Sequence, residues 1–167
     1  MASELRVDKI IPTTGVPTGG GGGIVQMLYS QKTDDFECTS TSYNDIGLSC
    51  SITPKFSTSK VLVRVNMTVI DTGSPDTVAT FRLLRGSTVI GSDTGDDRNG
   101  IALYYTGTAE GMQSVNFEYL DSPATTSATT YKVTMRGDTT DEVKINYWPP
   151  NNQYRGTSSM TVMEVSA

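Results

Sequence analysis

Apolar and polar residues alternate with a period of two along most of the chain from Ile24 onward. The clearest example is KVLVRVNMTVID, residues 60–71, where the odd-numbered positions 61–69 are all apolar and the residues between them include Arg64 and Asn66. Successive side chains of a strand point to opposite faces, so this alternation is typical of a half-buried β-strand. Further strands are predicted by the same pattern in residues 24–30, 45–52, 78–86 with 87–92, 101–105, 114–120, 130–136, 142–147 and 158–166.

The predicted strands are joined by segments rich in glycine, proline, aspartate and serine, which favour turns. No segment has the sustained apolar period of 3.6 residues that would indicate an amphipathic helix. Short strands at this spacing, without crossover helices, predict an all-β fold. We expect an antiparallel, jelly-roll-like β-sandwich with two sheets of four or five strands.

The first 23 residues differ from the rest of the chain. A few apolar side chains are followed by PTTGVPTGGGGG, residues 12–23, with two prolines and six glycines. We therefore divide the chain into an N-terminal anchoring segment with a glycine-rich neck, residues 1–23, and a β-sandwich domain, residues 24–167. Apolar side chains on an isolated peptide need a partner surface, so the predicted docking residues are Leu5, Val7, Ile10 and Ile11.

Charge and cysteine content exclude several classes of function. The net charge of −5 and the scattered 13 lysines and arginines argue against a nucleic-acid partner, whose phosphates would repel the chain. No apolar run approaches the roughly 20 residues of a membrane helix, and we expect neither membrane insertion nor a signal peptide. Cys38 and Cys50 are too few for a disulfide framework or a four-ligand zinc site, so we expect two small buried hydrophobes.

The sequence contains no histidine, which removes Ser-His-Asp and Cys-His nucleophile activation and every histidine-based metal site. We therefore expect no enzymatic activity, no catalytic residue, no cofactor and no metal. The acidic turn at residues 93–100 misses the first and last ligands of an EF-hand loop in register, and we interpret it as a solvated turn.

One catalytic alternative is an aspartic protease. Residues 69–78, VIDTGSPDTV, contain Asp71-Thr72-Gly73 after two apolar residues, which resembles the signature of that class. The chemistry needs two carboxylates that share a proton. A second Asp-Thr-Gly begins at Asp93, but it follows Gly-Ser rather than two apolar residues. A turn at the end of a strand explains both copies.

A binding surface is predicted in NYWPPNNQYRG, residues 146–156. Aromatic rings stack on sugar rings, and amide side chains bond their hydroxyls, while the two prolines would stiffen the loop. The alternative is that the tryptophan caps the end of the sandwich and the polar residues solvate a turn. LYYTG, residues 103–107, is a second candidate of the same kind. The predicted receptor-binding residues are Trp148, Asn151, Asn152 and Tyr154.

Four blocks of the sequence resemble tail-fibre and related virion proteins of tailed phages, particularly those that infect cyanobacteria. The blocks are MASELRVDKIIPTTGVPTGGGGGIVQ at residues 1–26, GLSCSITPKFSTSKVLVRV at 47–65, YLDSPATTSATTYKVTMRG at 119–137 and SSMTVMEVSA at 158–167. The resemblance implies a non-enzymatic virion protein, usually a homotrimer, whose N-terminal segment binds other tail, baseplate or capsid proteins. Its β-domain would face the host. The loop at residues 146–156 keeps a further alternative open, a carbohydrate-binding module that recognises a host envelope glycan. No shaft separates the segment from the domain, so a short baseplate fibre, a head-decoration protein and a head fibre remain alternatives.

The resemblance also gives the glycine run an interpretation. Glycine permits positive φ and very close approach of backbones. Around a threefold axis, three such strands can converge where any side chain would clash. We therefore predict a neck between particle and domain, formed by Gly19, Gly20, Gly21, Gly22 and Gly23.

Overall fold

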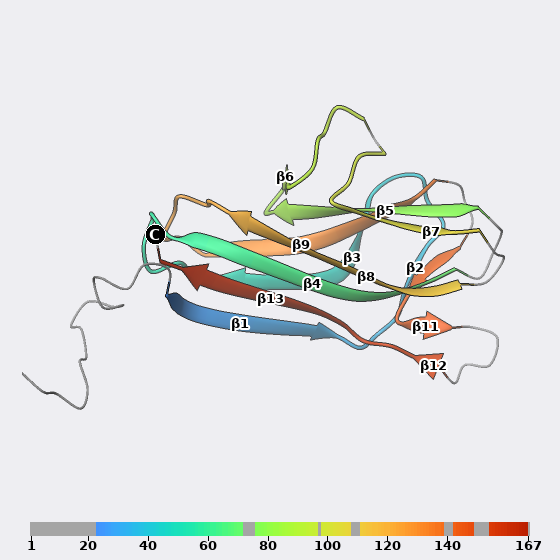
Figure 1. Ribbon diagram of the computed structural model, residues 1–167, viewed down its shortest axis with the longest axis horizontal. Helices are drawn as coiled ribbons and strands as arrows, with labels where there is room; N and C mark the ends of the chain where they lie inside the picture. The colour runs from blue at the N-terminus through green and yellow to red at the C-terminus, as the bar shows by residue number, and fades with distance from the viewer. Residues whose placement is uncertain are drawn as a thin grey trace, which may run out of the picture.

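The computed structural model describes residues 23–71, 76–96, 98–107, 111–138, 142–148 and 154–166. They form two antiparallel sheets packed face to face and one small hairpin (Figure 1), and no helix occurs among them. The predicted all-β sandwich is confirmed. The strands are β1 (Ile24–Lys32), β2 (Phe36–Cys38), β3 (Asn44–Ile52), β4 (Lys60–Asp71), β5 (Thr77–Arg85), β6 (Thr88–Ile90), β7 (Ala102–Thr106), β8 (Gly111–Asp121), β9 (Thr129–Gly137), β10 (Val143–Ile145), β11 (Tyr147–Trp148), β12 (Tyr154–Arg155) and β13 (Ser158–Val165).

The strand order is that of a jelly roll. In the first sheet β1, β13, β4 and β8 lie side by side, and β13 pairs with residues 60–66 of β4. At residues 69–71 the same edge of β4 pairs with β10, which in turn pairs with β2. In the second sheet the order is β3, β9, β5, with β7 and β6 sharing the remaining edge of β5. The first sheet therefore contains six strands rather than the expected four or five, although both sheets are four strands wide.

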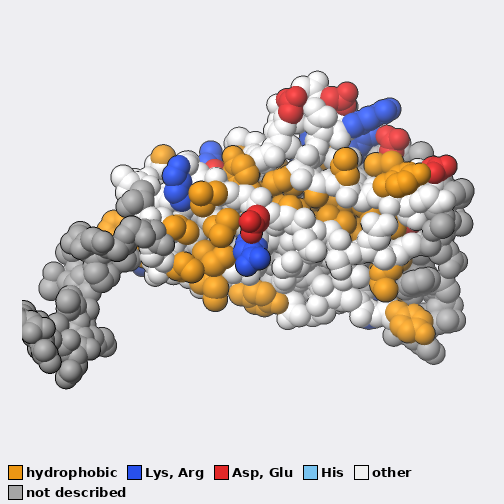
Figure 2. Space-filling view, viewed as in Figure 1, with side chains coloured by type: hydrophobic (Ala, Val, Ile, Leu, Met, Phe, Trp, Pro, Cys, Tyr) orange, Lys and Arg blue, Asp and Glu red, His pale blue; other side chains and the backbone are white. Residues whose placement is uncertain are grey.

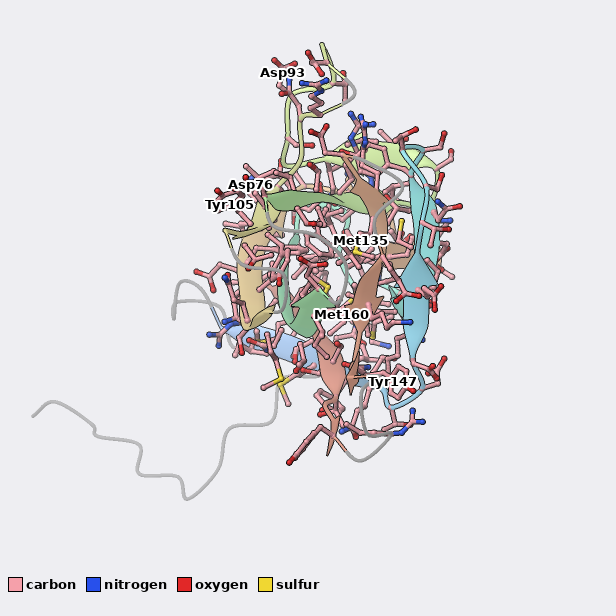
Figure 3. All side chains as sticks on the ribbon, turned by 90° about the vertical axis from the view of Figure 1, so that its right-hand side faces the viewer. Asp76, Asp93, Tyr105, Met135, Tyr147 and Met160 are labelled. Carbon is pink, nitrogen blue, oxygen red and sulfur yellow. The ribbon has the colours of Figure 1, made fainter. Side chains whose placement is uncertain are left out.

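The core lies between the two sheets, where the alternating apolar positions converge. In β4 the odd-numbered residues 61–69 are buried, whereas Arg64 and Asn66 are exposed, as the sequence pattern predicts. Met160 of the neighbouring strand β13 and Met135 of β9, which belongs to the opposite sheet, point into the same space (Figure 3). Burial of a side chain of this size contributes about 1.5–3 kcal/mol, so the period-two pattern accounts for the packing of the sheets.

Both cysteines are free and buried, as predicted. Cys38 ends the short strand β2, and Cys50 lies in β3, opposite Tyr131 of β9. The two thiols belong to the apolar core cluster. Burial raises the pKa of the Cys50 thiol, which keeps it protonated and unreactive.

The prediction of one strand over residues 142–147 is wrong, because the chain forms β10 and then β11. β10 ends at Ile145, and the next residue, Asn146, has a φ of 66°, which asparagine adopts more readily than most residues. The side-chain nitrogen Nδ2 of Asn146 donates to the Lys32 carbonyl at 3.0 Å, and its Oδ1 accepts from Ser158 Oγ at 2.7 Å. These bonds redirect the chain away from the first sheet.

The two ends of the sandwich carry different parts of the chain. At one end Ser166 N donates to Gly23 O at 3.0 Å, so β1 begins beside the end of β13. The hairpin of β11 and β12 lies at the opposite end (Figure 1). The twelve residues of β4 run between these ends, over about 40 Å. The predicted docking residues and Gly19–Gly22 lie outside the described residues.

Candidate ligand-binding groove

A groove lies between the β11–β12 hairpin and the outer face of the first sheet. The hairpin leaves the sheet between β10 and β13, which both pair with the same edge of β4. The groove has a volume of about 470 Å³ and is lined by residues of β4, β8 and the end of the hairpin: Thr68, Ile70, Met112, Gln113, Ser114, Tyr154, Arg155 and Gly156. Its floor is thus sheet and one wall is hairpin.

Gly156 allows the hairpin to lie directly on β4. Its backbone N–H donates to the Asn146 carbonyl at 3.0 Å. A Cβ at this position would lie 2.7 Å from the Thr68 Oγ1 atom and within 3 Å of two other Thr68 side-chain atoms. Any side chain here would push the hairpin away from the sheet, so the shape of the groove depends on this glycine.

Cations flank the aromatic ring at the base of the hairpin. The guanidinium of Arg155 lies 4.9 Å from the centre of the Tyr147 ring, and the ammonium of Lys144 lies 5.6 Å from it. Arg155 also lies 3.6 Å from Asp35. Cation–π contacts contribute about 0.5–1 kcal/mol each at exposed sites. Together they hold β12 against the rest of the molecule.

The buried lysine beside this ring keeps its charge. Burial by itself would lower the pKa of Lys144, but hydrogen bonds to Glu142 and Glu37, at 2.8 and 2.6 Å, outweigh it and raise the pKa above its ordinary value. The paired ammonium is therefore charged at neutral pH and fixes β10 to β2.

The groove surface combines an aromatic ring with hydroxyl groups and one cationic group. Tyr154 is 61% exposed, and Met112 is also exposed on the floor opposite. Thr68 and Ser114 add hydroxyl groups, and Arg155 adds a guanidinium. A ring face next to hydroxyl and guanidinium groups can stack on a flat apolar ligand surface and hydrogen-bond its edges. The arrangement is suited to binding.

The structure places one of the four predicted receptor-binding residues in this groove. Tyr154 forms part of the wall. The backbone of Trp148 lies in β11, but its side chain lies outside the described part of the chain, as do Asn151 and Asn152. Their role in binding stays a prediction.

The groove also contains residues that sequence reasoning missed. Thr68 belongs to β4, and Met112 and Ser114 belong to β8, all far along the chain from the hairpin. Met112 pairs with Ile70 on the outer face of the first sheet. An apolar residue on the otherwise polar face of a strand was the signal available for Met112. Nothing local indicated the other two.

The two aspartates of the protease-like motifs lie in different environments. Asp71 ends β4 and is buried. Asp93 lies in the exposed loop between β6 and β7, where its Oδ1 accepts from Gly95 N at 2.9 Å (Figure 3). Protease chemistry needs both carboxylates in one site. Thr72 and Gly73 lie outside the described residues, and within the described part no three Asp, Glu or Cys side chains gather as metal ligands.

No protein-family model matches the chain, and no curated protein matches it. Among solved structures, a chain in the structure of infectious bursal disease virus Gx strain aligns with 93% of this chain at 12% identity and a TM-score of 0.41. A chain in the structure of the Gt strain of the same virus aligns with 94% at 14% identity and a TM-score of 0.40. The protein spans less than half the length of either chain, 44% and 43%. In the described residues no helix is long and apolar enough to cross a membrane.

Proposed function

We propose that this chain is a structural protein of a tailed-phage virion, a short homotrimeric tail or baseplate fibre. Residues 1–23 dock it to other virion proteins, and the sandwich domain faces the host surface. Two features support the proposal: the sequence blocks that resemble tail-fibre proteins, and the division into an apolar N-terminal segment and a β-sandwich. The proposal assigns no catalytic step, cofactor or metal to the chain.

The opposite placement of Gly23 and the hairpin carries the proposal. Gly23 and Ser166 are hydrogen-bonded at one end of the sandwich. The opposite end carries β12 (Figure 1), whose Tyr154 lines the groove. A chain held by the residues before Gly23 therefore presents the groove away from its attachment point. This is the geometry required of a protein that connects a particle to a host.

The ligand that fits the groove is a saccharide of the host envelope. The exposed ring of Tyr154 offers a stacking surface, and Thr68, Ser114 and Arg155 offer hydrogen-bonding groups at the floor and wall. Sugar rings have an apolar face and a polar edge, so they match such a surface. Trp148, Asn151 and Asn152 remain proposed receptor-binding residues on the basis of the sequence of this segment.

The proposal separates attachment from recognition, and different variants of the phage test the two parts. Deletion of residues 2–18 should remove the protein from purified particles. Tyr154→Ala should leave the protein in the particles but reduce adsorption to the host, while Tyr154→Phe, which keeps the ring, should adsorb nearly normally. Full incorporation of the deletion variant would refute docking by the N-terminal segment. Normal adsorption of the alanine variant would reject the groove as the receptor site.

Imaging of particles labelled with an antibody against this chain distinguishes the proposed location from its alternatives. Label at the tail or baseplate is expected. Label distributed over the head would replace the tail fibre by a head-decoration protein or head fibre. Absence of label from intact particles would refute the virion assignment.

A further inference from the structure

The groove beside Tyr154 continues along the outer face of β4 and β8, towards the end of the sandwich where β1 begins. A second hollow of about 220 Å³ lies on this face and is lined by Arg64, Val65, Asn66, Asn116, Phe117 and Glu118. Residues two apart on a strand share one face, so Asn66 lies next to Thr68 of the groove, and Asn116 lies next to Ser114. The two hollows are therefore parts of one surface.

Four pairs of facing residues form this surface. From the hairpin towards the beginning of β1, they are Ile70 with Met112, Thr68 with Ser114, Asn66 with Asn116, and Arg64 with Glu118. Neighbouring pairs lie two residues apart, so the four pairs extend over about 20 Å. They follow the direction of the strands, and we call these eight residues the strand track.

Most of the strand track is polar but carries no net charge. Its two middle pairs present hydroxyl and amide groups, which both donate and accept hydrogen bonds. In the last pair, Arg64 Nε lies 3.3 Å from a carboxylate oxygen of Glu118, so the opposite charges balance. Figure 2 shows this face as a white stretch between a single pair of opposite charges and the hydrophobic side chains at the end that carries β12. The track therefore offers donors and acceptors to a neutral ligand.

We propose that the strand track binds a linear, neutral glycan of several sugar residues, with one part in the groove beside Tyr154 and the next at Asn66 and Asn116. The inference rests on the saccharide ligand of the proposed function and specifies its length, charge and direction. Sugar hydroxyls both donate and accept hydrogen bonds, as the side chains of the track do. The chain carries a net charge of −5 and would repel an acidic polysaccharide.

An extended peptide fits this surface less well than a glycan. A peptide recognises a sheet mainly through main-chain hydrogen bonds to an exposed strand edge. The track lies on the face of the sheet, and β4 is paired with β13 and β10 along one edge and with β8 along the other. Its main-chain groups are thus used within the sheet, and side chains alone face the ligand.

The direction of the track agrees with the proposed attachment. A glycan that enters beside the β11–β12 hairpin runs back along β4 towards the end of the sandwich where Gly23 and Ser166 are hydrogen-bonded. The host envelope then lies beyond the hairpin, away from the attachment point. A single sugar reaches the groove alone, whereas each further sugar contacts another pair of the track, so affinity should rise with chain length.

Titration calorimetry on the full-length chain tests the length dependence. The probe is polysaccharide extracted from the envelope of the host strain, cleaved by mild acid and separated by size and charge. The wild type should bind neutral fragments of several sugars more tightly than the shortest fragments. Equal affinity for all lengths would overturn the track while leaving the groove as the saccharide site. No binding to any fraction or to the uncleaved polysaccharide would refute the saccharide ligand itself.

Matched alanine variants test the path of the glycan. Asn66 and Asn116 are exposed, and Asn66→Ala and Asn116→Ala should each weaken binding of the longer fragments by about threefold to tenfold without affecting the shortest. Gln31 is an exposed amide in the same row of the sheet, opposite Ser159, and β13 separates it from the track. Gln31→Ala should therefore bind normally. Far-UV circular dichroism confirms that each variant is folded.

The results distinguish the track from other arrangements. Normal binding of the longer fragments by both asparagine variants would refute the track. A loss in Gln31→Ala equal to that in Asn116→Ala would overturn the direction along the strands in favour of a ligand that crosses them. Binding confined to the acidic fragments would overturn the neutral glycan. Binding of the envelope extract that resists periodate oxidation but is lost after protease treatment would identify a peptide instead.

Discussion

Glu164 offers a quantitative test of how the end of the sandwich beside β1 is held together. This carboxylate is buried on β13 and accepts three hydrogen bonds, from Gln26 Nε2 at 2.6 Å, Lys55 N at 2.8 Å and Phe56 N at 3.2 Å. It therefore joins β1 and the loop before β4 to the centre of the first sheet. We predict that its removal weakens the fold far more than removal of an exposed carboxylate.

The hydrogen bonds set the size of the effect. Glu164→Ala leaves two backbone N–H groups and one amide without their acceptor, and each such group costs about 1–3 kcal/mol when buried. Because Lys55 and Phe56 are partly accessible to water, we expect a loss near the lower end, about 3 kcal/mol in total. Glu164→Gln keeps one acceptor oxygen but loses the charge, and should cost about 1–2 kcal/mol.

The effect should depend on pH in a defined direction. Burial alone would raise the pKa of Glu164, but the bonds from Lys55 N, Gln26 and Phe56 N outweigh it and hold the pKa below its ordinary value of 4.5. A lowered pKa in the folded state stabilises the fold above the unfolded value and loses that contribution as the pH falls through the folded value. The difference between wild type and Glu164→Gln should therefore be full at neutral pH and shrink under acid conditions.

Urea unfolding followed by far-UV circular dichroism, at one protein concentration, measures these losses. For a chain of this length 1 kcal/mol corresponds to about 2–4 °C in the midpoint of thermal unfolding, so Glu164→Ala should lower it by about 6–12 °C. Glu118→Gln is the matched control, since this glutamate and its partner Arg64 are exposed, and it should cost less than about 1 kcal/mol. Equal stability of Glu164→Gln and wild type at neutral pH would refute the reasoning, as would a deficit that persists unchanged in acid.

Substitutions at four further positions test the hairpin and the core. Gly156→Val should displace the hairpin and speed tryptic cleavage after Arg155 while leaving the unfolding midpoint within a few degrees; unchanged cleavage contradicts the close packing. Tyr131→Phe removes the 2.7 Å hydrogen bond from the buried hydroxyl to Asp121 and should cost about 1–2 kcal/mol in urea unfolding. Asp121→Ala also removes the acceptor of Arg85 and should cost about 3 kcal/mol. Equal losses for the two variants would argue against the joint role of Asp121. Asn146→Ala should destabilise the fold by about 1 kcal/mol more than Asn146→Gly, because alanine also resists the positive φ, and the reverse order would contradict the role of that backbone conformation.

The sequence predicted the main strands well because alternation is a local property. Residues 60–71 match β4 in both bounds, and the buried positions 61–69 are those assigned to the core. Strands of two or three residues, such as β2 and β12, are too short to show a period. The break at Asn146 depends on bonds to Lys32 and Ser158, which belong to other strands, so the pattern around it gave no indication.

The candidate binding surfaces likewise contain residues that the local sequence indicated and residues that only the pairing of strands brought there. Local composition pointed to Tyr154, which the structure places in the groove wall. The floor of that groove depends on Thr68 and Met112, which the pairing of β4 with β8 places below the hairpin. The pairing of Leu62 with Met163 and Leu120 on the outer face of the first sheet was not predicted, although Leu62 interrupts the polar face of β4.

By itself, then, the sequence determined which residues form strands and which face of each strand is buried, because one strand's alternation is enough to separate core from surface. The tertiary structure alone decided which strands are neighbours and in what register. Leu62 becomes part of a row only because β13 and β8 place Met163 and Leu120 opposite it, and Gly156 forms a groove only because the chain crosses Thr68. Pairing between distant strands is set by turns and by packing of the whole core, and neither leaves a local period in the chain.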